Sequence, residues 1–406
     1  MYMNFNRKSQ FEHRLVKYFF IIFITFIFSS VAYAKKNKRT WDYPLHYYKK
    51  FEIVGSEDFF KFKFDLRKDE DIIREIKNNQ ETGVIGYLLY EDEKITIDVS
   101  DMPTHARKDG RVIIDGLLPS HSIGKSLVSY VTGHAICEGY IKSVHEKITG
   151  WKTVQNTLYQ DQVLIDLLNM QAGDDKYVGE RIRPRADSKL KKYYPKISVN
   201  TMPLRDLLQF HFQGSKKHIP SFNAKKPKYN YSALTTNVIM NYVIYKTGKD
   251  WEQLLHKVFN NHIKVKENVR FLQTEKRANL GSLLTETGRY SFYATRYDYL
   301  RIAKAMLDDW HNNTCAGKYL KMLYKQRIKK DKSTIDPPTD LALVTTSYGG
   351  QFHFDISGLQ KRKIIGMSGF AGQQILIDID KKRIIVVNSF YRNYDWKKIV
   401  YDKIKH

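Results

Sequence analysis

The sequence has 406 residues, of which 42% are hydrophobic, and its formal net charge is +25. A chain of this length can bury a large core and form two lobes without metal or disulfide staples. Its basic residues are spread along the whole chain, so the positive charge indicates a solvated surface, and we expect no nucleic-acid partner.

The N-terminal segment has the composition of a secretory signal peptide. An apolar run over residues 18–31 is followed by the small-residue motif Ala32-Tyr33-Ala34. We therefore expect residues 1–34 to be a signal peptide cleaved after Ala34, and the mature protein to be periplasmic or secreted. The run is short for a transmembrane span, so we expect no stable membrane span after cleavage, with an uncleaved anchor as the alternative. Four basic residues precede the run: Arg7, Lys8, Arg14 and Lys17.

Residues 35–55 are polar and aromatic, and we expect them to form a linker to one domain over residues 56–406. The stretch 82–100 has the pattern of two strands around an Asp-Glu turn, and 110–120 is another apolar extended run. From Ser122 the pattern changes to that of a helix with one apolar face. This face comprises Leu127, Val128, Val131, Ala135 and Ile136.

The middle of the chain has helical spacing, and the C-terminal part returns to strands. Thr295 and Asp298 have the spacing of a capping box that opens one of these helices. We expect strands within 341–355 and 372–391 and a last helix over 395–404. The other helical segments are 161–173, 201–210, 235–249 and 250–259.

Strands at both ends of the domain predict a shared antiparallel sheet, with a helical lobe over roughly residues 127–340 inserted between them. The expected fold class is therefore α/β of the α+β type, an antiparallel sheet flanked by helices. Cys137 and Cys315 are the two cysteines. A chain of this size needs no disulfide, and the apolar surroundings of Cys137 favour a buried free thiol, although an oxidising compartment permits a bond.

Residues 119–126, PSHSIGKS, allow two interpretations. They lack one glycine of a phosphate-binding P-loop, and they contain the S-x-x-K motif of serine acyl-transfer enzymes as Ser122 and Lys125. Pro119 stands where a P-loop needs a glycine, so we favour the second interpretation. Residues i and i+3 share a helix face, which brings Lys125 to Ser122. We expect burial to lower the pKa of Lys125 so that it acts as a base, and Gly124 to leave room for a substrate or loop.

Residues 120–141 resemble the S-x-x-K helix of the serine β-lactamase and penicillin-binding-protein superfamily. They are most similar to the class C β-lactamase-like serine hydrolases, which include esterases and 6-aminohexanoate-dimer hydrolase. The resemblance covers roughly residues 80–395 and implies a β-lactamase/transpeptidase-like fold. Further segments resemble family motifs in the expected order: 163–175, 229–249, 288–307 and 366–387.

The resemblance also implies roles for single residues. Ser122 would be the nucleophile, Lys125 the general base, and Tyr231 the group that carries a proton to the leaving group. Tyr229 is a weaker candidate than Tyr231, and a tyrosine of the core is the alternative interpretation of Tyr231. The backbone amides of Ser122 and Phe370 would form the oxyanion hole.

Two departures from the family pattern bear on the substrate. Ser368 and Gly369 match the second and third positions of the [KH]-[TS]-G box, but Met367 replaces its cation, and Ala233 replaces the polar residue of the Y-x-N motif. Without the cation, a carboxylate-bearing β-lactam or D-Ala-D-Ala terminus loses a contact of about 1.5 to 3 kcal/mol. We therefore expect a neutral or differently charged ester or amide.

Other chemistries have little support in the sequence. It contains no G-x-S-x-G elbow, and His211, His218 and His353 lack partners at metal-ligand spacing, so we expect no metal and no cofactor. We expect His121 to support the site without touching the reacting atoms, or to face solvent.

We therefore expect an exported serine hydrolase that cleaves a small-molecule ester or amide through an acyl-enzyme on Ser122. The alternatives are a D-alanyl carboxypeptidase or β-lactamase, and a non-catalytic binding protein on the same fold. The sequence does not define the oligomeric state.

Overall fold

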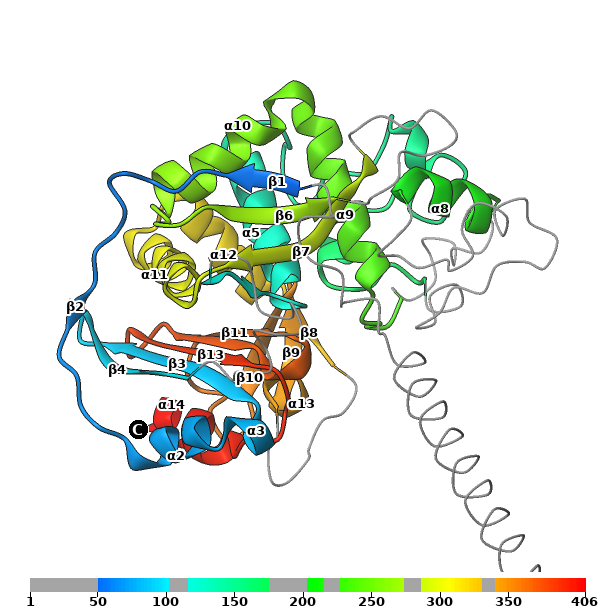
Figure 1. The fold of residues 1–406 in the computed structure, drawn as a ribbon. Helices are drawn as coiled ribbons and strands as arrows, with labels where there is room; N and C mark the ends of the chain where they lie inside the picture. Colours follow the sequence, from blue (N-terminus) through cyan, green and yellow to red (C-terminus); the bar gives the residue numbers. More distant parts are fainter. Residues whose placement is uncertain (1–49, 102–115, 175–202, 215–226, 274–285, 331–339) are drawn as a thin grey trace, which may run out of the picture.

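The computed structural model describes residues 50–101, 116–174, 203–214, 227–273, 286–330 and 340–406. They form a larger and a smaller sheet with helices packed against both (Figure 1). The signal peptide expected over residues 1–34 lies outside the described residues, as does most of the extended run expected over 110–120. No described helix has both the length and the apolar composition that a membrane span requires.

The larger sheet contains nine described strands and unites both ends of the domain. Its order is β2-β4-β3-β13-β12-β11-β10-β9-β8, and all neighbours are antiparallel except β2, which is parallel to β4. The prediction of a shared antiparallel sheet is therefore confirmed. The strands are β2 (Lys63–Phe64), β3 (Val84–Glu91), β4 (Lys94–Ser100), β8 (Ile328–Lys329), β9 (Thr345–Gly349), β10 (Phe352–Ile356), β11 (Ile364–Ser368), β12 (Gln374–Asp378) and β13 (Arg383–Ser389).

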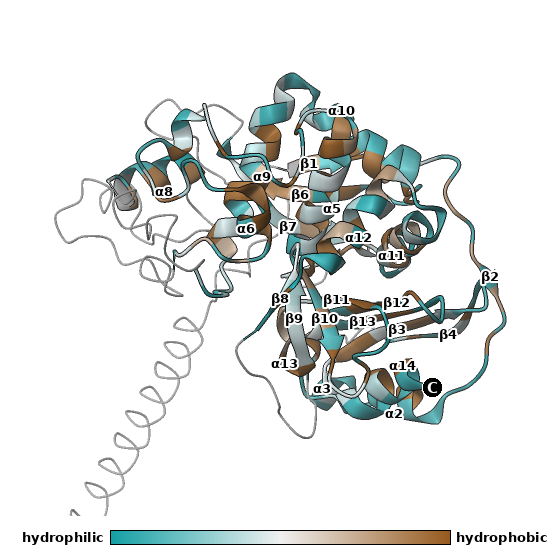
Figure 2. Cartoon of the chain, turned by 180° about the vertical axis from the view of Figure 1, so that it is seen from behind, coloured by the Kyte–Doolittle hydropathy of each residue, from teal (hydrophilic) through white to brown (hydrophobic). Residues whose placement is uncertain are grey.

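Each face of this sheet has its own hydrophobic core, because successive side chains of a strand point to opposite faces. On β13, Ile384 and Val386 belong to one core, whereas Ile385 and Val387 belong to the other. Figure 1 shows helices on both faces, and Figure 2 shows the hydrophobic residues of the strands and adjoining helices between them. One face carries α5 (Ile123–Cys137), α11 (Arg296–Asn312) and α12 (Cys315–Lys325); the other carries α2 (Glu70–Lys77) and α14 (Asp402–Lys405).

The smaller sheet corrects two boundaries expected from the sequence. Its strand order is β1-β6-β7-β5, all antiparallel. The linker expected over 35–55 is wrong at its end, because Phe51 and Ile53 are buried in a strand paired with β6. The lobe expected over 127–340 is not purely helical, because it contributes two of these strands. The strands are β1 (Lys50–Ile53), β5 (Leu118–Pro119), β6 (Val269–Gln273) and β7 (Gly288–Ala294).

The local predictions held where short-range chemistry decides the structure. Asp92 and Glu93 join β3 to β4 with φ of 49° and 61°, and the Thr295 hydroxyl accepts from the amide of Asp298 at the start of α11. The strand expected from residue 341 begins later, because the Asp340 side chain caps a helical turn. The other helical segments are α3 (Asn79–Thr82), η3 (Lys152–Val154), α6 (Leu164–Leu168), α8 (Leu204–His211), α9 (Ala233–Thr247), η5 (Gly248–Asp250), α10 (Trp251–His256), η6 (Lys257–His262), α13 (Leu341–Val344), η8 (Phe370–Gly372) and η9 (Lys397–Tyr401).

The two cysteines form a disulfide. The sulfur atoms of Cys137 and Cys315 are 2.07 Å apart, and the bond joins the end of α5 to the start of α12. The interpretation of Cys137 as a buried free thiol is therefore wrong. The partner lies 178 residues away, and the sequence does not show that the two helices meet at these ends.

Candidate active site

Ser122 lies where β5 turns into helix α5. His121 has a positive φ of 47°, which makes the turn sharp. Ser120 holds the turn in place, because its amide donates to the Phe292 carbonyl at 2.8 Å and its Oγ accepts from the Phe292 amide at 3.0 Å. Ser122 is the N-cap residue of α5, and its hydroxyl makes no capping bond. The positive end of the helix dipole therefore lies at the hydroxyl, where it favours a developing negative charge.

Lys125 lies one helical turn after Ser122 and points back to it. Its Nζ donates to Ser122 Oγ over 2.8 Å, and only 2% of the residue is exposed. Gly124 makes this packing possible, because a Cβ there would lie 1.9 Å from the carbonyl oxygen of Tyr290 in β7. The space that the sequence assigned to a substrate or loop is therefore occupied by a strand of the smaller sheet.

Two tyrosines surround the Lys125 ammonium group. Its Nζ lies 4.7 Å from the ring centroid of Tyr231 and 4.0 Å from that of Tyr290. Burial alone would lower the pKa of Lys125, but the Tyr231 and Tyr290 hydroxyls beside it outweigh burial, and the pKa is raised above its ordinary value. The prediction of a lowered pKa is therefore wrong, because the surroundings are not purely apolar.

The other wall of the site comes from the end of β11 and the turn that follows. Gly369 packs so closely on the Ser122 turn that a Cβ would lie 2.7 Å from the Ser120 carbonyl oxygen. Phe370 comes next, half exposed, and its ring contacts that of His121 with centroids 5.7 Å apart. His121 thus packs on this wall, and burial lowers its pKa to about 4. Ser122 and Phe370 therefore both line one cleft, described below.

Met367 and Ser368 have different surroundings. Met367 is fully buried in the core between the large sheet and α5, so it does not line the site. Ser368 does line the site, and its hydroxyl donates to Asp340 Oδ1 over 3.1 Å. Asp340 also forms an ion pair with Arg392. The hydroxyl of the box motif is therefore tied to a buried carboxylate.

A cleft of about 330 Å³ opens between these walls. It brings together Ser122, Tyr231, Ser368, Gly369 and Phe370, while Lys125 lies behind Ser122. Tyr229, the weaker candidate, also lines the cleft and packs on Tyr348 with ring centroids 5.1 Å apart. The cleft is lined by Ser122, Tyr229, Tyr231, Lys330, Ala342, Leu343, His353, Ser368, Gly369, Phe370 and Arg392.

Sequence reasoning missed two cations of this cleft. Lys330 donates from Nζ to the Ala342 carbonyl and to Thr345 Oγ1, both over 2.7 Å, and burial lowers its pKa to about 8. Arg392 donates to the Gly369 carbonyl over 3.2 Å. Lys330 therefore brings to the cleft positive charge that the motif lacks at Met367, whereas the charge of Arg392 is balanced by Asp340. Neither residue belongs to a recognisable motif, so no local signal identified them.

His353 also lines the cleft, although the sequence analysis examined it only as a possible metal ligand. It is buried on β10, and burial together with Lys330 and Lys125 holds its pKa well below the ordinary value. Its imidazole is therefore neutral. Its Nδ1 lies 3.3 Å from Thr345 Oγ1.

The chain has the fold of the serine β-lactamase and penicillin-binding-protein superfamily. This follows from solved structures that match it over most of their length, at sequence identities that establish the fold alone. The fold that the motif resemblance implies is thereby confirmed.

Three of these structures show the range of the fold. A Bacillus anthracis protein described as a 6-aminohexanoate-dimer hydrolase is 13% identical, with a TM-score of 0.58 over 90% of this chain and 92% of its own. A class C β-lactamase from Rhodobacter sphaeroides is 13% identical, with a TM-score of 0.51 over 83% and 99%. FmtA from Staphylococcus aureus is 14% identical, with a TM-score of 0.51 over 86% and 93%.

Comparison of the sequence with protein-family profiles and curated proteins adds little evidence on function. No protein-family profile matches the chain. A curated protein of Plasmodium falciparum, MATH and LRR domain-containing protein PFE0570w, is 30% identical over 169 residues, which is 41% of this chain but 2% of that protein. The chain spans so little of that protein that the match carries no functional argument.

Proposed function

We propose that this chain is a serine hydrolase that cleaves an ester or amide bond through an acyl-enzyme on Ser122, within one domain that includes strand β1 (Lys50–Ile53). The observation that carries the proposal is the 2.8 Å hydrogen bond from the buried Lys125 Nζ to Ser122 Oγ, beside Tyr231 and at the mouth of a cleft. A nucleophile in contact with a cation and a phenol can lose its proton and attack a carbonyl.

Acylation begins when Ser122 Oγ attacks the carbonyl carbon of the substrate. Lys125 in its uncharged amine form accepts the serine proton along the hydrogen bond between Nζ and Oγ, and Tyr231 beside it can pass that proton on. The raised pKa of Lys125 implies that this amine form becomes more populated as the pH rises.

The tetrahedral intermediate places its oxyanion between the amides of Ser122 and Phe370. The Ser122 amide is among those at a helix start that have no intrahelical acceptor. Removing one oxyanion donor typically costs about 10²- to 10³-fold in rate. Tyr231, which is 42% exposed in the cleft, then delivers the proton to the leaving group, and water hydrolyses the acyl-enzyme.

A second candidate function, a β-lactamase or D-alanyl carboxypeptidase, is favoured by one observation. Lys330 and Arg392 line the cleft, and although Arg392 is paired with Asp340, Lys330 supplies positive charge for a substrate carboxylate. The absence of a cation at Met367 therefore argues less strongly against such substrates than the motif alone suggests. The remaining alternative, a non-catalytic binding protein, predicts that no acylating reagent modifies Ser122.

We also propose that the protein is exported to the periplasm or outside the cell. The Cys137–Cys315 disulfide supports this, because such bonds persist in oxidising compartments. Mass spectrometry of the protein from its native cells would test it: an N-terminus at residue 35 supports cleavage after Ala34, and an intact leader contradicts it.

The central experiment measures initial rates of p-nitrophenyl acetate and butyrate hydrolysis. We expect turnover or a burst that Ser122→Ala abolishes. Tyr231→Phe should lower the rate, whereas the matched control Tyr245→Phe should not, because Tyr245 is similarly exposed at 40% but lies on α9 away from the cleft lining. Equal, negligible rates for the wild type and Ser122→Ala would refute the esterase proposal.

A second assay separates the candidates. The chain is incubated with fluorescent penicillin, and the labelled peptide is identified by mass spectrometry. Labelling at Ser122 with slow release favours the cell-wall enzyme. Ester turnover without penicillin labelling favours the esterase-like enzyme, and the absence of both favours a binding protein.

A further inference from the structure

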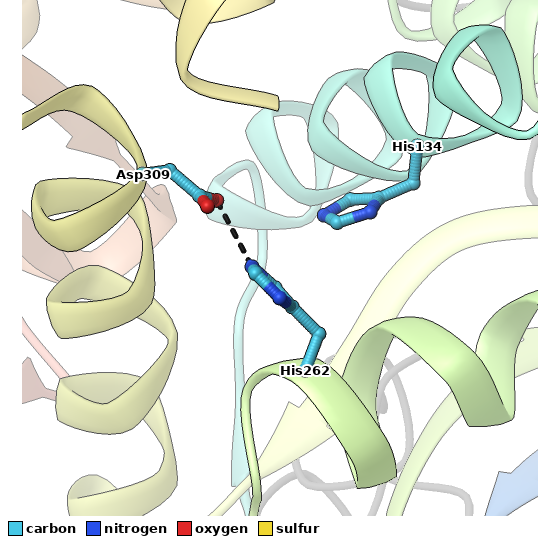
Figure 3. Close-up of side chains that lie close together, drawn as sticks. All are labelled: His134, His262 and Asp309. Atoms are coloured by element: carbon cyan, nitrogen blue, oxygen red, sulfur yellow. Dashed lines mark hydrogen bonds and ion pairs between the residues drawn. The ribbon is translucent and has the colours of Figure 1, made fainter. Parts of the chain in front are cut away.

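A cluster of metal-ligating side chains lies far from the cleft, at the other end of α5. It consists of His134 on α5, His262 at the end of η6 and Asp309 near the end of α11, and Figure 3 shows the three side chains converging. Twelve residues of helix separate His134 from Ser122, which is about 18 Å at 1.5 Å per residue. The cluster therefore takes no part in the chemistry proposed for Ser122.

The distances within the cluster suit one metal ion. His262 Nε2 lies 3.1 Å from Asp309 Oδ2, and one ligand atom from each of the three residues lies within 4.8 Å of the others. Zinc ligands at about 2.0 to 2.2 Å in tetrahedral geometry lie about 3.3 Å from one another. The His262–Asp309 pair already has this spacing, and the ligand atom of His134 lies within 4.8 Å of both.

One atom of the cluster lacks a hydrogen-bond partner among the described residues. His134 Nε2 is buried from solvent and makes no hydrogen bond there. A buried polar atom without a partner costs free energy, and such atoms are uncommon in native structures. The ring of His134 packs against that of His262, with centroids 4.9 Å apart, so the unpartnered edge lies beside the other two ligands. A metal ion at the centre would satisfy this atom.

The carboxylate is held in place by neighbouring side chains. Asp309 is almost fully buried, and it accepts hydrogen bonds from the Tyr130 hydroxyl and, over 2.7 Å, from Thr314 Oγ1. Outer contacts of this kind orient the ligands of metal sites. The His262 side chain is 37% exposed, so an ion and a water ligand can reach the cluster from solvent.

The elements that carry the ligands are also fixed relative to one another. The Cys137–Cys315 disulfide lies one helical turn after His134 and joins α5 to the helix that follows Asp309. On the other side, Lys257 at the start of η6 donates to Glu138 at the end of α5 over 2.6 Å. The three donors are therefore preorganised, which limits the entropy lost when an ion binds.

We propose that His134, His262 and Asp309 form a binding site for a divalent transition-metal ion, with zinc as the natural probe. Two imidazoles and one carboxylate suit zinc better than calcium or magnesium, which prefer oxygen ligands. With three protein ligands and an open fourth position, the site would link α5, η6 and α11 and stabilise the lobe behind the cleft.

The test is zinc binding to the purified, chelator-treated full chain with its disulfide intact. We expect native mass spectrometry to show one zinc ion per chain and calorimetry to give a micromolar or tighter Kd. His262→Ala and Asp309→Asn should each weaken binding at least tenfold. The matched control His256→Ala should bind as the wild type does, because His256 is also exposed but lies outside the cluster.

Thermal unfolding gives a second measurement that does not depend on activity. Zinc should raise the Tm of the wild type and of His256→Ala but not that of His262→Ala, because a ligand that binds the folded state stabilises it. His262→Ala replaces a partly exposed side chain, so of the two ligand variants it should disturb folding least. Failure of the wild type to bind one zinc ion, or equal binding by His262→Ala, would overturn the proposal.

Discussion

Replacing both cysteines with serine should destabilise the protein without altering the cleft. The disulfide connects residues 178 apart in sequence, so it restricts a long loop of the unfolded chain. In the chain-entropy relation, a loop of this length corresponds to about 5 kcal/mol at 25 °C, and measured losses for native disulfides are about 2 to 5 kcal/mol. We therefore expect the free energy of unfolding to fall by about 2 to 5 kcal/mol in the Cys137→Ser, Cys315→Ser double variant.

Urea denaturation followed by circular dichroism measures this difference. The wild type with dithiothreitol is the matched control, because it breaks the same bond without changing the sequence. The reduced wild type and the double variant should unfold at similar, lower urea concentrations than the oxidised wild type. Equal midpoints for all three samples, or two free thiols titrated in the native oxidised protein, would refute the reasoning.

Four further predictions concern residues in and around the cleft. Lys125→Ala should lower kcat/KM for p-nitrophenyl acetate by about 10²- to 10⁴-fold, which is the usual contribution of an acid–base group. The control Lys142→Ala changes an exposed lysine and should leave kcat/KM unchanged. Equal rates in the two variants would contradict the role of Lys125 as general base. The pKa of Lys330 is lowered from 10.5 to about 8, so KM for a carboxylate-bearing ester should rise as the pH passes 8, and Lys330→Met should abolish that dependence. Because the folded protein then binds fewer protons than the unfolded chain between about pH 8 and 10.5, Lys330 should also make stability rise with pH across that window, which urea titrations at several pH values would detect. Gly124→Ala should destabilise the protein by about 1 to 3 kcal/mol, because the new Cβ would meet the Tyr290 carbonyl at 1.9 Å, and a thermal scan that matches the wild type would count against this packing.

The features that the sequence predicted correctly depend on neighbours in the chain. The reach of Lys125 to Ser122 follows from one turn of helix, and the cap at Thr295 follows from a spacing of three residues. The turn at Asp92 and Glu93 is equally local. In each case the residues that make the contact lie within a few positions of one another, so tertiary packing had little to change.

The features that the sequence did not predict depend on elements far apart in the chain. In the sequence, Lys330 precedes strands β9 to β13 and Arg392 follows them. The two residues come to line one cleft only in the folded sheet. The pKa of Lys125 was misjudged for the same reason, because Tyr290 arrives from β7 and no motif ties it to the lysine. The cluster of His134, His262 and Asp309 is a third example, since its members have no characteristic spacing in the sequence.

The order of strands in the large sheet has a consequence for biosynthesis. β3 lies near the beginning of the domain, but its partner β13 lies near the end, so Ile384 must be available before it can pair with Tyr90. The sheet therefore cannot close before residues 383–389 have been synthesised, and pairing between such distant segments is slow. The proposed export would require the chain to cross a membrane unfolded. A delay in sheet formation would keep it unfolded until then. If the protein is exported as proposed, the sheet would form after β13 has crossed the membrane, on the side where Cys137 and Cys315 can be oxidised.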